Sequence, residues 1–131
     1  MTRIRGTLLL AAGLALAAVV TTPAHHSGAM FDETRTVTFE GVIREMQWTN
    51  PHSWLLVDVR GDDGTVTTWG FEAEGPSTLR RAGIRPSDLR AGAEITITGR
   101  PMKDGRTAAL WVEAVLADGR KLDPRKGFEV R

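Results

Sequence analysis

The sequence predicts a mainly β fold, and three observations indicate which one. Five segments alternate apolar and polar residues or are rich in β-branched residues, as half-buried strands are. In the first segment the alternation changes phase at Gly41, which indicates a bulge or a sharp coil. A short helical pattern separates the third segment from the fourth. Three strands, a helix and two strands are the order of a small OB-like five-stranded β-barrel, with a short helical insert between strands 3 and 4. A small open α+β sheet or a fragment of a sandwich fits less well, because the barrel leaves no open sheet edge.

Each element has a local signal. The expected strands span residues 36–48, 53–60, 65–72, 93–100 and 107–117. The second and third strands are joined by GDDG, a tight hairpin turn. Ser77 is expected to cap a helix over residues 78–82, and Gly83 to end it. Residues 123–131 mix charges, and we expect them to form a flexible C-terminal tail.

The first 24 residues have the three-part layout of a secretory signal peptide. Arg3 and Arg5 precede an uncharged apolar stretch, and small residues follow it up to Ala24. The apolar stretch, residues 7–20, is shorter than the ~20 residues that a transmembrane helix needs. We therefore expect export by the general secretory route to the periplasm or outside the cell, with no stable membrane span after cleavage. The processed chain then consists of an N-terminal segment, 25–35, the barrel domain, 36–122, and the tail.

Composition excludes several classes of function. The chain has 17 Lys and Arg against 16 Asp and Glu, and loss of the leader removes two of the arginines. The remainder is almost neutral and has no basic run, so we expect no nucleic-acid partner. The absence of cysteine excludes a disulfide framework, a thiolate nucleophile and a cysteine-based zinc site. No GxSxG motif and no glycine-rich phosphate loop is present.

Histidines are the first candidate functional residues. The chain has three, and two of them, His25 and His26, directly follow the predicted leader. Imidazole is a common ligand of copper and zinc. Cleavage after Ala24 gives His25 a free α-amine, and amine and ring together can chelate one ion. His52 can supply a further nitrogen for a Cu(II) site, and we expect the fold to hold it within reach of His25.

Two nearby side chains can contribute to such a copper site. Met30 carries a soft thioether suited to Cu(I), and Asp32 can orient an imidazole ring or add a ligand. A structural interpretation stands beside this one. Exposed termini are commonly disordered, and His52 follows Asn50-Pro51, a turn in which a histidine can simply contact the backbone.

Tryptophans are the second candidate feature. The chain has four of them and no tyrosine, and Trp48 and Trp54 flank the segment TNPHS. Together with Asn50 they can form an aromatic ligand-binding face, as barrels of this type do. The alternative is that these side chains belong to the core, because Trp is highly buried on average. Glu72 and Glu74 lie two residues apart on a strand, and we expect such a pair to face solvent.

Several stretches together resemble a known family. They are HHSGAMFD, VTFEGVIREMQWTNPHSW, the DDG hairpin, GPSTLRRAG and the closing ADGRKL. They are similar to a family of small exported bacterial proteins known as domain of unknown function 6152, from His25 to about Leu122. The resemblance implies export and a compact β domain, and it implies no established activity. Gly28 departs from the pattern, since a bulky residue is expected after HHS.

Three hypotheses about function follow. The first is a non-enzymatic exported binding module that binds copper through His25, His26 and His52. The second is a metal-free envelope module that recognises a small ligand or an envelope protein with its tryptophan face. The third, a copper redox enzyme with a histidine brace, ranks last because the sequence shows neither an open coordination position nor a substrate surface. We therefore favour binding over catalysis, with copper as the one cofactor considered.

Overall fold

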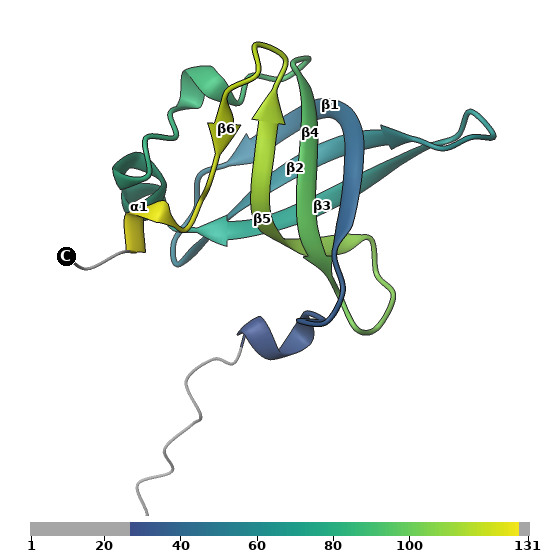
Figure 1. Ribbon diagram of the computed structural model, residues 1–131, viewed down its shortest axis with the longest axis horizontal. Helices are drawn as coiled ribbons and strands as arrows, with labels where there is room; N and C mark the ends of the chain where they lie inside the picture. Colours follow the sequence, from purple (N-terminus) through teal and green to yellow (C-terminus); the bar gives the residue numbers. More distant parts are fainter. Residues whose placement is uncertain (1–26, 129–131) are drawn as a thin grey trace, which may run out of the picture.

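Strand pairing closes the main sheet into a barrel. The computed structural model describes residues 27–128, in which six strands follow the order β3-β2-β1-β4-β5-β6 (Figure 1). The β3 strand also pairs with β5 in parallel, so the first five strands form a closed barrel. The neighbour order 1-2-3-5-4-1, with a small helix between β3 and β4, confirms the OB-like fold expected from the sequence.

The observed elements lie within a few residues of the expected ones. The strands are β1 Val37–Gln47, β2 His52–Arg60, β3 Val66–Glu74, β4 Glu94–Pro101, β5 Ala108–Leu116 and β6 Lys121–Leu122. The helix is α1 Pro76–Arg81, and three short 3-10 helices are η1 Ser27–Met30, η2 Pro86–Asp88 and η3 Lys126–Phe128. Among the described residues no helix is both long enough and apolar enough to cross a membrane. The predicted leader, 1–24, lies outside the described residues.

Gly41 allows β1 to pair with two neighbouring strands. The first half of β1 pairs with β4 and the second half with β2, with the change at Val42. A Cβ atom at Gly41 would lie 2.6 Å from the Asp58 carbonyl oxygen and 2.7 Å from Val57 Cγ1, so only glycine fits here. The register shift itself lies slightly further on, between Ile43 and Glu45. The phase change in the sequence at Gly41 therefore marks the place where β1 coils and changes its pairing partner from β4 to β2.

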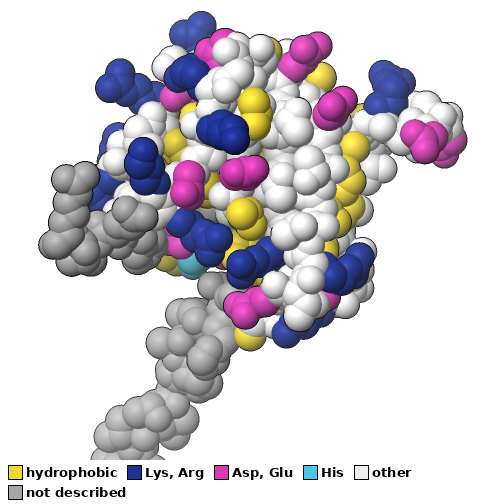
Figure 2. All heavy atoms as spheres, viewed as in Figure 1, with side chains coloured by type: hydrophobic (Ala, Val, Ile, Leu, Met, Phe, Trp, Pro, Cys, Tyr) yellow, Lys and Arg dark blue, Asp and Glu magenta, His cyan; other side chains and the backbone are white. Residues whose placement is uncertain are grey.

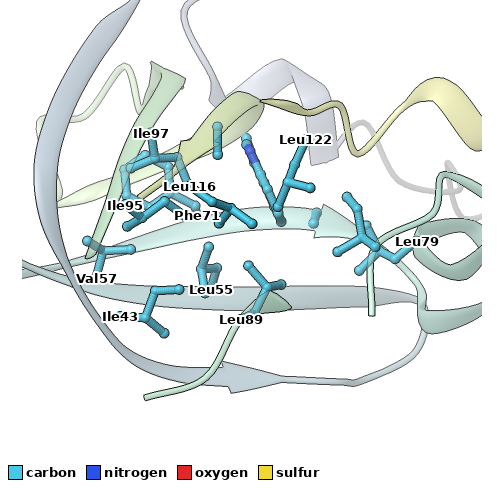
Figure 3. Packing of buried hydrophobic residues seen from close by; sticks show 14 of the residues in the cluster. Ile43, Leu55, Val57, Phe71, Leu79, Leu89, Ile95, Ile97, Leu116 and Leu122 are labelled. Carbon is cyan, nitrogen blue, oxygen red and sulfur yellow. The ribbon is translucent and has the colours of Figure 1, made fainter. Parts of the chain in front are cut away.

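The barrel interior is filled by the inward-facing residues of each strand. On β2 these are Ser53, Leu55 and Val57, which alternate with half-buried residues on the outer side. The buried cluster in Figure 3 combines Leu55 and Val57 with side chains of the other strands and of the segment after β3. Its further members include Ile43, Phe71, Leu79, Ile84, Leu89, Ile97, Trp111, Leu116 and Leu122. This core fixes the register of β2 and β3, because a shift by one residue would turn its members outward.

The helix begins earlier than the sequence predicts. Its N-cap is Gly75, and Ser77 lies inside the first turn without capping it, so the expected serine cap is wrong. Pro76 explains the difference, since its fixed φ suits the first helical position, where no N–H partner is needed. The expected end is correct: Gly83 has φ 83°, a left-handed conformation that favours glycine.

The C-terminal segment contacts the domain. Strand β6 pairs with β5, and Pro124 is fully buried. Helix η3 lies beside α1, where Arg81 Nε donates a hydrogen bond of 3.5 Å to the Gly127 carbonyl oxygen (Figure 1). Up to residue 128 these contacts differ from the flexible tail expected over 123–131, and residues 129–131 lie outside the described residues.

Candidate functional site

A polar cluster lies on the outer face of β2 and β3, at the end of the barrel where β2 begins. In the antiparallel register His52 is opposite Glu74, and Trp54 is opposite Glu72. Their neighbours along the two strands point into the core, so these four side chains share the outer face. A cavity of about 200 Å³ opens beside them; its walls are His52, Glu72, Ala73, Glu74, Leu110, Trp111, Pro124 and Arg125.

Glu72 is a buried acid in contact with an imidazole. Only 3% of its surface is exposed, and its Oε1 lies 3.3 Å from Nδ1 of His52, whose side chain is 32% exposed. Burial raises the pKa of Glu72, the facing His52 opposes this rise, and Glu74 adds to it. The pair thus consists of an inner carboxylate and an outer ring that remains open to solvent.

The loop before β2 fixes the position of His52. Thr49 Oγ1 donates a hydrogen bond to the His52 carbonyl oxygen, and Ser53 Oγ donates one of 3.3 Å to the Thr49 carbonyl oxygen. A Cβ atom at Gly75 would lie 2.8 Å from Asn50 Oδ1, so this loop packs closely on the end of β3. The expected ligand-binding residue Asn50 is exposed and belongs to this packing.

One buried donor borders the same cavity. Trp111 is 1% exposed, and its Nε1 has no hydrogen-bond partner within residues 27–128. Buried indole N–H groups usually have a partner, because leaving one unpaired costs free energy. The walls of the cavity beside His52 therefore include a buried acid, an imidazole and a buried tryptophan whose Nε1 has no partner among the described residues.

A second cavity of about 570 Å³ lies next to η1. It is lined by Met30, Trp54, Met102, Gly105, Arg106, Thr107 and Ala108. Trp54 is half-buried against Gly70, where a Cβ atom would lie 3.3 Å from Cε3 of the indole. Trp48 has a different environment and packs against the core cluster. The two tryptophans that the sequence groups into one face therefore have different environments, one lining this cavity and the other packed against the core.

The other expected ligands fall into two groups. His25 and His26 lie outside the described residues, and the expected closeness of His25 to His52 therefore stays a prediction. Asp32 is inside them, and its Oδ1 accepts hydrogen bonds from Thr34 N (3.0 Å) and Thr34 Oγ1 (2.6 Å). These bonds lower the pKa of Asp32, and the residue lines neither cavity. Within residues 27–128, no three His, Asp or Glu side chains form a metal-binding group.

The burial of Glu72 differs from what the sequence predicts. The spacing of Glu72 and Glu74 predicts a solvated pair on a strand edge, and this prediction is wrong for Glu72, which is buried. The reason is barrel closure: β3 pairs with β2 on one side and with β5 on the other, where Glu72 is opposite Leu110. A third strand in an OB-like barrel has no free edge, and this signal was available in the sequence order.

On the face shown in Figure 2, acidic and basic side chains are interspersed rather than gathered into a patch of one sign. Several oppositely charged side chains of the described residues are paired, such as Arg120 Nη1 with Asp88 Oδ1 at 2.9 Å and Arg106 Nε with Asp104 Oδ2 at 2.7 Å. This face therefore offers no continuous basic stripe for a polyanion.

Comparison with known proteins gives one match. The model of a family described as a family of unknown function (DUF6152) matches residues 13–112. No curated protein and no solved structure matches the chain.

Proposed function

The chain belongs to the family of unknown function DUF6152, and from its own residues we propose that it is an exported, non-enzymatic binding protein that holds copper at His52. The observation that carries the proposal is the contact between His52 Nδ1 and the buried Glu72 carboxylate. In metal sites a carboxylate commonly accepts the second ring N–H of a histidine ligand, which orients the ring and makes it more basic. The other nitrogen, Nε2, is then free to bind the ion.

The environment of the pair supports a ligand role. A buried carboxylate is costly unless it is paired, so its place behind His52 needs a compensating contact or function. The loop before β2 holds the His52 backbone through its carbonyl oxygen, and Glu72 contacts the His52 ring at Nδ1. A ring held in one orientation loses less freedom when it binds an ion, which favours affinity.

The remaining ligands in this proposal come from the N-terminal segment. Ser27 begins η1 and directly follows His26 in the chain. Helix η1 is fixed to the loop after β4, because Lys103 N donates a hydrogen bond of 2.9 Å to the Met30 carbonyl oxygen. Met30 lines a cavity with Trp54, which lies two residues from His52 on the same face. The proposal assigns the further nitrogens to His25 and His26 because they directly precede Ser27 in the chain.

Export is part of the proposal because it creates a ligand. Signal cleavage after Ala24 would give His25 a free α-amine beside its ring, and the two nitrogens can chelate Cu(II) together. Mass spectrometry of the protein recovered from the periplasm tests this step. The expected mass is that of a chain beginning at His25, and a chain cut at another bond would remove the amine ligand from the proposal.

Titration of the processed protein with Cu(II) against a competing chelator tests the function. We expect one tight site, and we expect His52→Ala to weaken it about 100-fold, since loss of an orienting contact alone costs about 10- to 100-fold. Asp32→Asn is the matched control, because that carboxylate is already engaged by Thr34 and should leave affinity unchanged.

Two results would overturn the proposal. Equal Cu(II) affinity in wild type and His52→Ala would show that His52 is not a ligand. Absence of binding at micromolar Cu(II) would favour the metal-free envelope module, with the half-buried Trp54 as its aromatic contact.

A further inference from the structure

Two of the chain's four methionines line one cavity with a tryptophan. We propose that this cavity, between Met30, Met102 and Trp54, is a second metal site that binds a soft monovalent cation, Cu(I) or Ag(I), through the two thioether sulfurs. The site is distinct from the one at His52, since the two cavities share no lining residue. It does not depend on copper binding at His52.

Backbone pairing brings together the two segments that carry Met30 and Met102. Phe31 and Met102 form an antiparallel bridge, and Lys103 N donates a hydrogen bond of 2.9 Å to the Met30 carbonyl oxygen. Asp32 N donates a further bond of 2.8 Å to the Pro101 carbonyl oxygen. Phe31, between Met30 and Asp32, is 1% exposed and anchors the segment in the interior. Met30 and Met102 therefore lie on neighbouring, hydrogen-bonded segments that are far apart in sequence.

The exposure of the two methionines differs in a way that suits a cation site. Met102 is 6% exposed and belongs to the floor, whereas Met30 is 43% exposed and is one of three large exposed hydrophobic residues in the described chain. An inner and an outer thioether allow an ion to enter from solvent and bind without rearrangement of the barrel. The flexible Met30 side chain can close over it.

Trp54 supplies the third wall. Its indole is fixed against Gly70, where the missing Cβ leaves room for the ring. A cation beside an indole face is attracted by the ring quadrupole, most strongly when both are shielded from water. The half-buried position of Trp54 meets that condition.

The composition of the cavity selects soft cations over hard ones. Thioethers favour Cu(I)-like ions, whereas Ca²⁺ and Mg²⁺ need several oxygen ligands. No carboxylate lines the cavity. The one cationic wall residue, Arg106, is neutralised by Asp104, whose Oδ2 lies 2.7 Å from the guanidinium Nε. Charge repulsion from Arg106 is therefore reduced.

The test uses Ag(I), which matches Cu(I) in softness and needs no reductant. The full chain carrying His25→Ala, His26→Ala and His52→Ala, labelled with ¹³C at the methionine methyl groups, is titrated with silver nitrate and followed by NMR. We expect one equivalent to bind, with shifts of the Met30 and Met102 methyl signals. Met46 packs against the core cluster and serves as the internal control, with no shift.

Substitution completes the test. In the same triple-alanine background, Met30→Leu with Met102→Leu should lower Ag(I) affinity about tenfold or more, while Met46→Leu leaves it unchanged. Met30→Leu alone, at an exposed position, replaces the double variant if Met102→Leu does not fold. Unchanged affinity in the methionine variants, or shifts that spare Met30 and Met102, would overturn the proposal and leave the two side chains as packing residues. Neither result bears on Cu(II) binding at His52.

Discussion

Glu72 is expected to lower the stability of the fold and, in the proposed copper site, to position His52. Its carboxylate is buried on the outer side of β3, in contact with His52 and near Glu74, whose charge adds to its raised pKa. A charge in such a place is usually a net cost to folding, which a neutral side chain of the same shape would avoid. A residue that lowers stability while positioning a ligand is typical of functional sites.

Replacement of this acid should separate the two effects. Glu72→Gln keeps the shape and removes the charge, so we expect the metal-free protein to gain about 1 kcal/mol and its Tm to rise by about 4–8 °C at neutral pH. Cu(II) affinity should fall about tenfold, because the neutral amide supports a ligating imidazole less well. Thermal unfolding and Cu(II) titration of the same samples provide both readings. A variant that is less stable and binds copper normally would assign Glu72 a purely structural role.

At the residue scale, the sequence indicates which residue types can act as ligands better than it indicates which residues surround them. The interest of His52 follows from the residue type and from its place in the block WTNPHSW. Its partner Glu72 lies 20 positions away and becomes a neighbour only through the register of β2 with β3. Pair contacts of this kind depend on strand register, which alternation alone defines to within a residue or two.

At the level of elements, one acid links the first three strands. Asp58 on β2 accepts hydrogen bonds from Arg44 Nε on β1, at 2.8 and 3.1 Å, and from Thr68 Oγ1 on β3, at 2.7 Å. Both partners favour the ionised form and lower the pKa of Asp58, the Arg44 hydrogen bond most strongly. A lowered carboxylate pKa means that folding is favoured when the group is charged.

This linkage predicts how stability depends on pH. The contribution of Asp58 is complete above the pKa of about 3.9 that an unfolded aspartate has, and it is lost as pH falls through the lower folded value. Asp58→Asn should therefore lower Tm at pH 7, and the difference from wild type should shrink below about pH 4. Thermal unfolding between pH 2 and 7 measures it. Asp62→Asn, at the exposed tip of the β2–β3 hairpin, is the control. A Tm difference that does not change with pH would contradict the ionic origin.

Strand positions are more predictable than the ends of helices. Strand interiors follow from alternation, and the hairpin glycines mark where chains turn, as Gly64 and Gly105 do with their positive φ angles. The start of α1 differs from the prediction because Ser77 is a good cap in isolation, whereas Gly75 and Pro76 together begin the helix two residues earlier. The Gly75-Pro76 pair and Ser77 are alternative helix starts, and the close packing of Gly75 against the loop before β2 favours the first.

At the level of the whole molecule, the barrel is completed by its C-terminal segment. Leu122 is 6% exposed and Pro124 is fully buried, and both lie beyond the five strands that form the barrel. Gly127 lies so close to the Thr78 carbonyl oxygen that a Cβ would collide with it. The mixed charges of this segment hide these contacts in the sequence, because two buried apolar residues among charged ones show no periodic pattern.

Truncation tests the role of that segment. A chain that ends at Asp123 loses Pro124 and η3, and we expect its free energy of unfolding to fall by about 2 kcal/mol, as for loss of one buried apolar side chain. Urea denaturation gives the value. Lys126→Ala, at an exposed position of η3, is the control and should stay within about 0.5 kcal/mol of wild type. An unchanged urea midpoint after truncation would mean that these contacts add nothing to stability.

The fold as a whole was predictable because strand order, a coil in the first strand and one helix in a fixed place leave few alternatives. The candidate site was only partly predictable: barrel closure, and not a local motif, buries Glu72, and long-range backbone pairing brings the segments of Met30 and Met102 together. On the outer face of β2 and β3, His52 contacts the buried Glu72, and Trp54, two residues further along β2, lines the cavity that Met30 and Met102 also line.

The central claim is that copper binds His52 with Glu72 behind it. The most direct measurement is a crystal structure of the processed protein with Cu(II), with anomalous diffraction recorded at the copper edge. We predict an anomalous peak about 2.0 Å from His52 Nε2, with Nδ1 still in contact with Glu72. A copper peak bound only by other residues, with the His52 ring free of metal, would contradict the account.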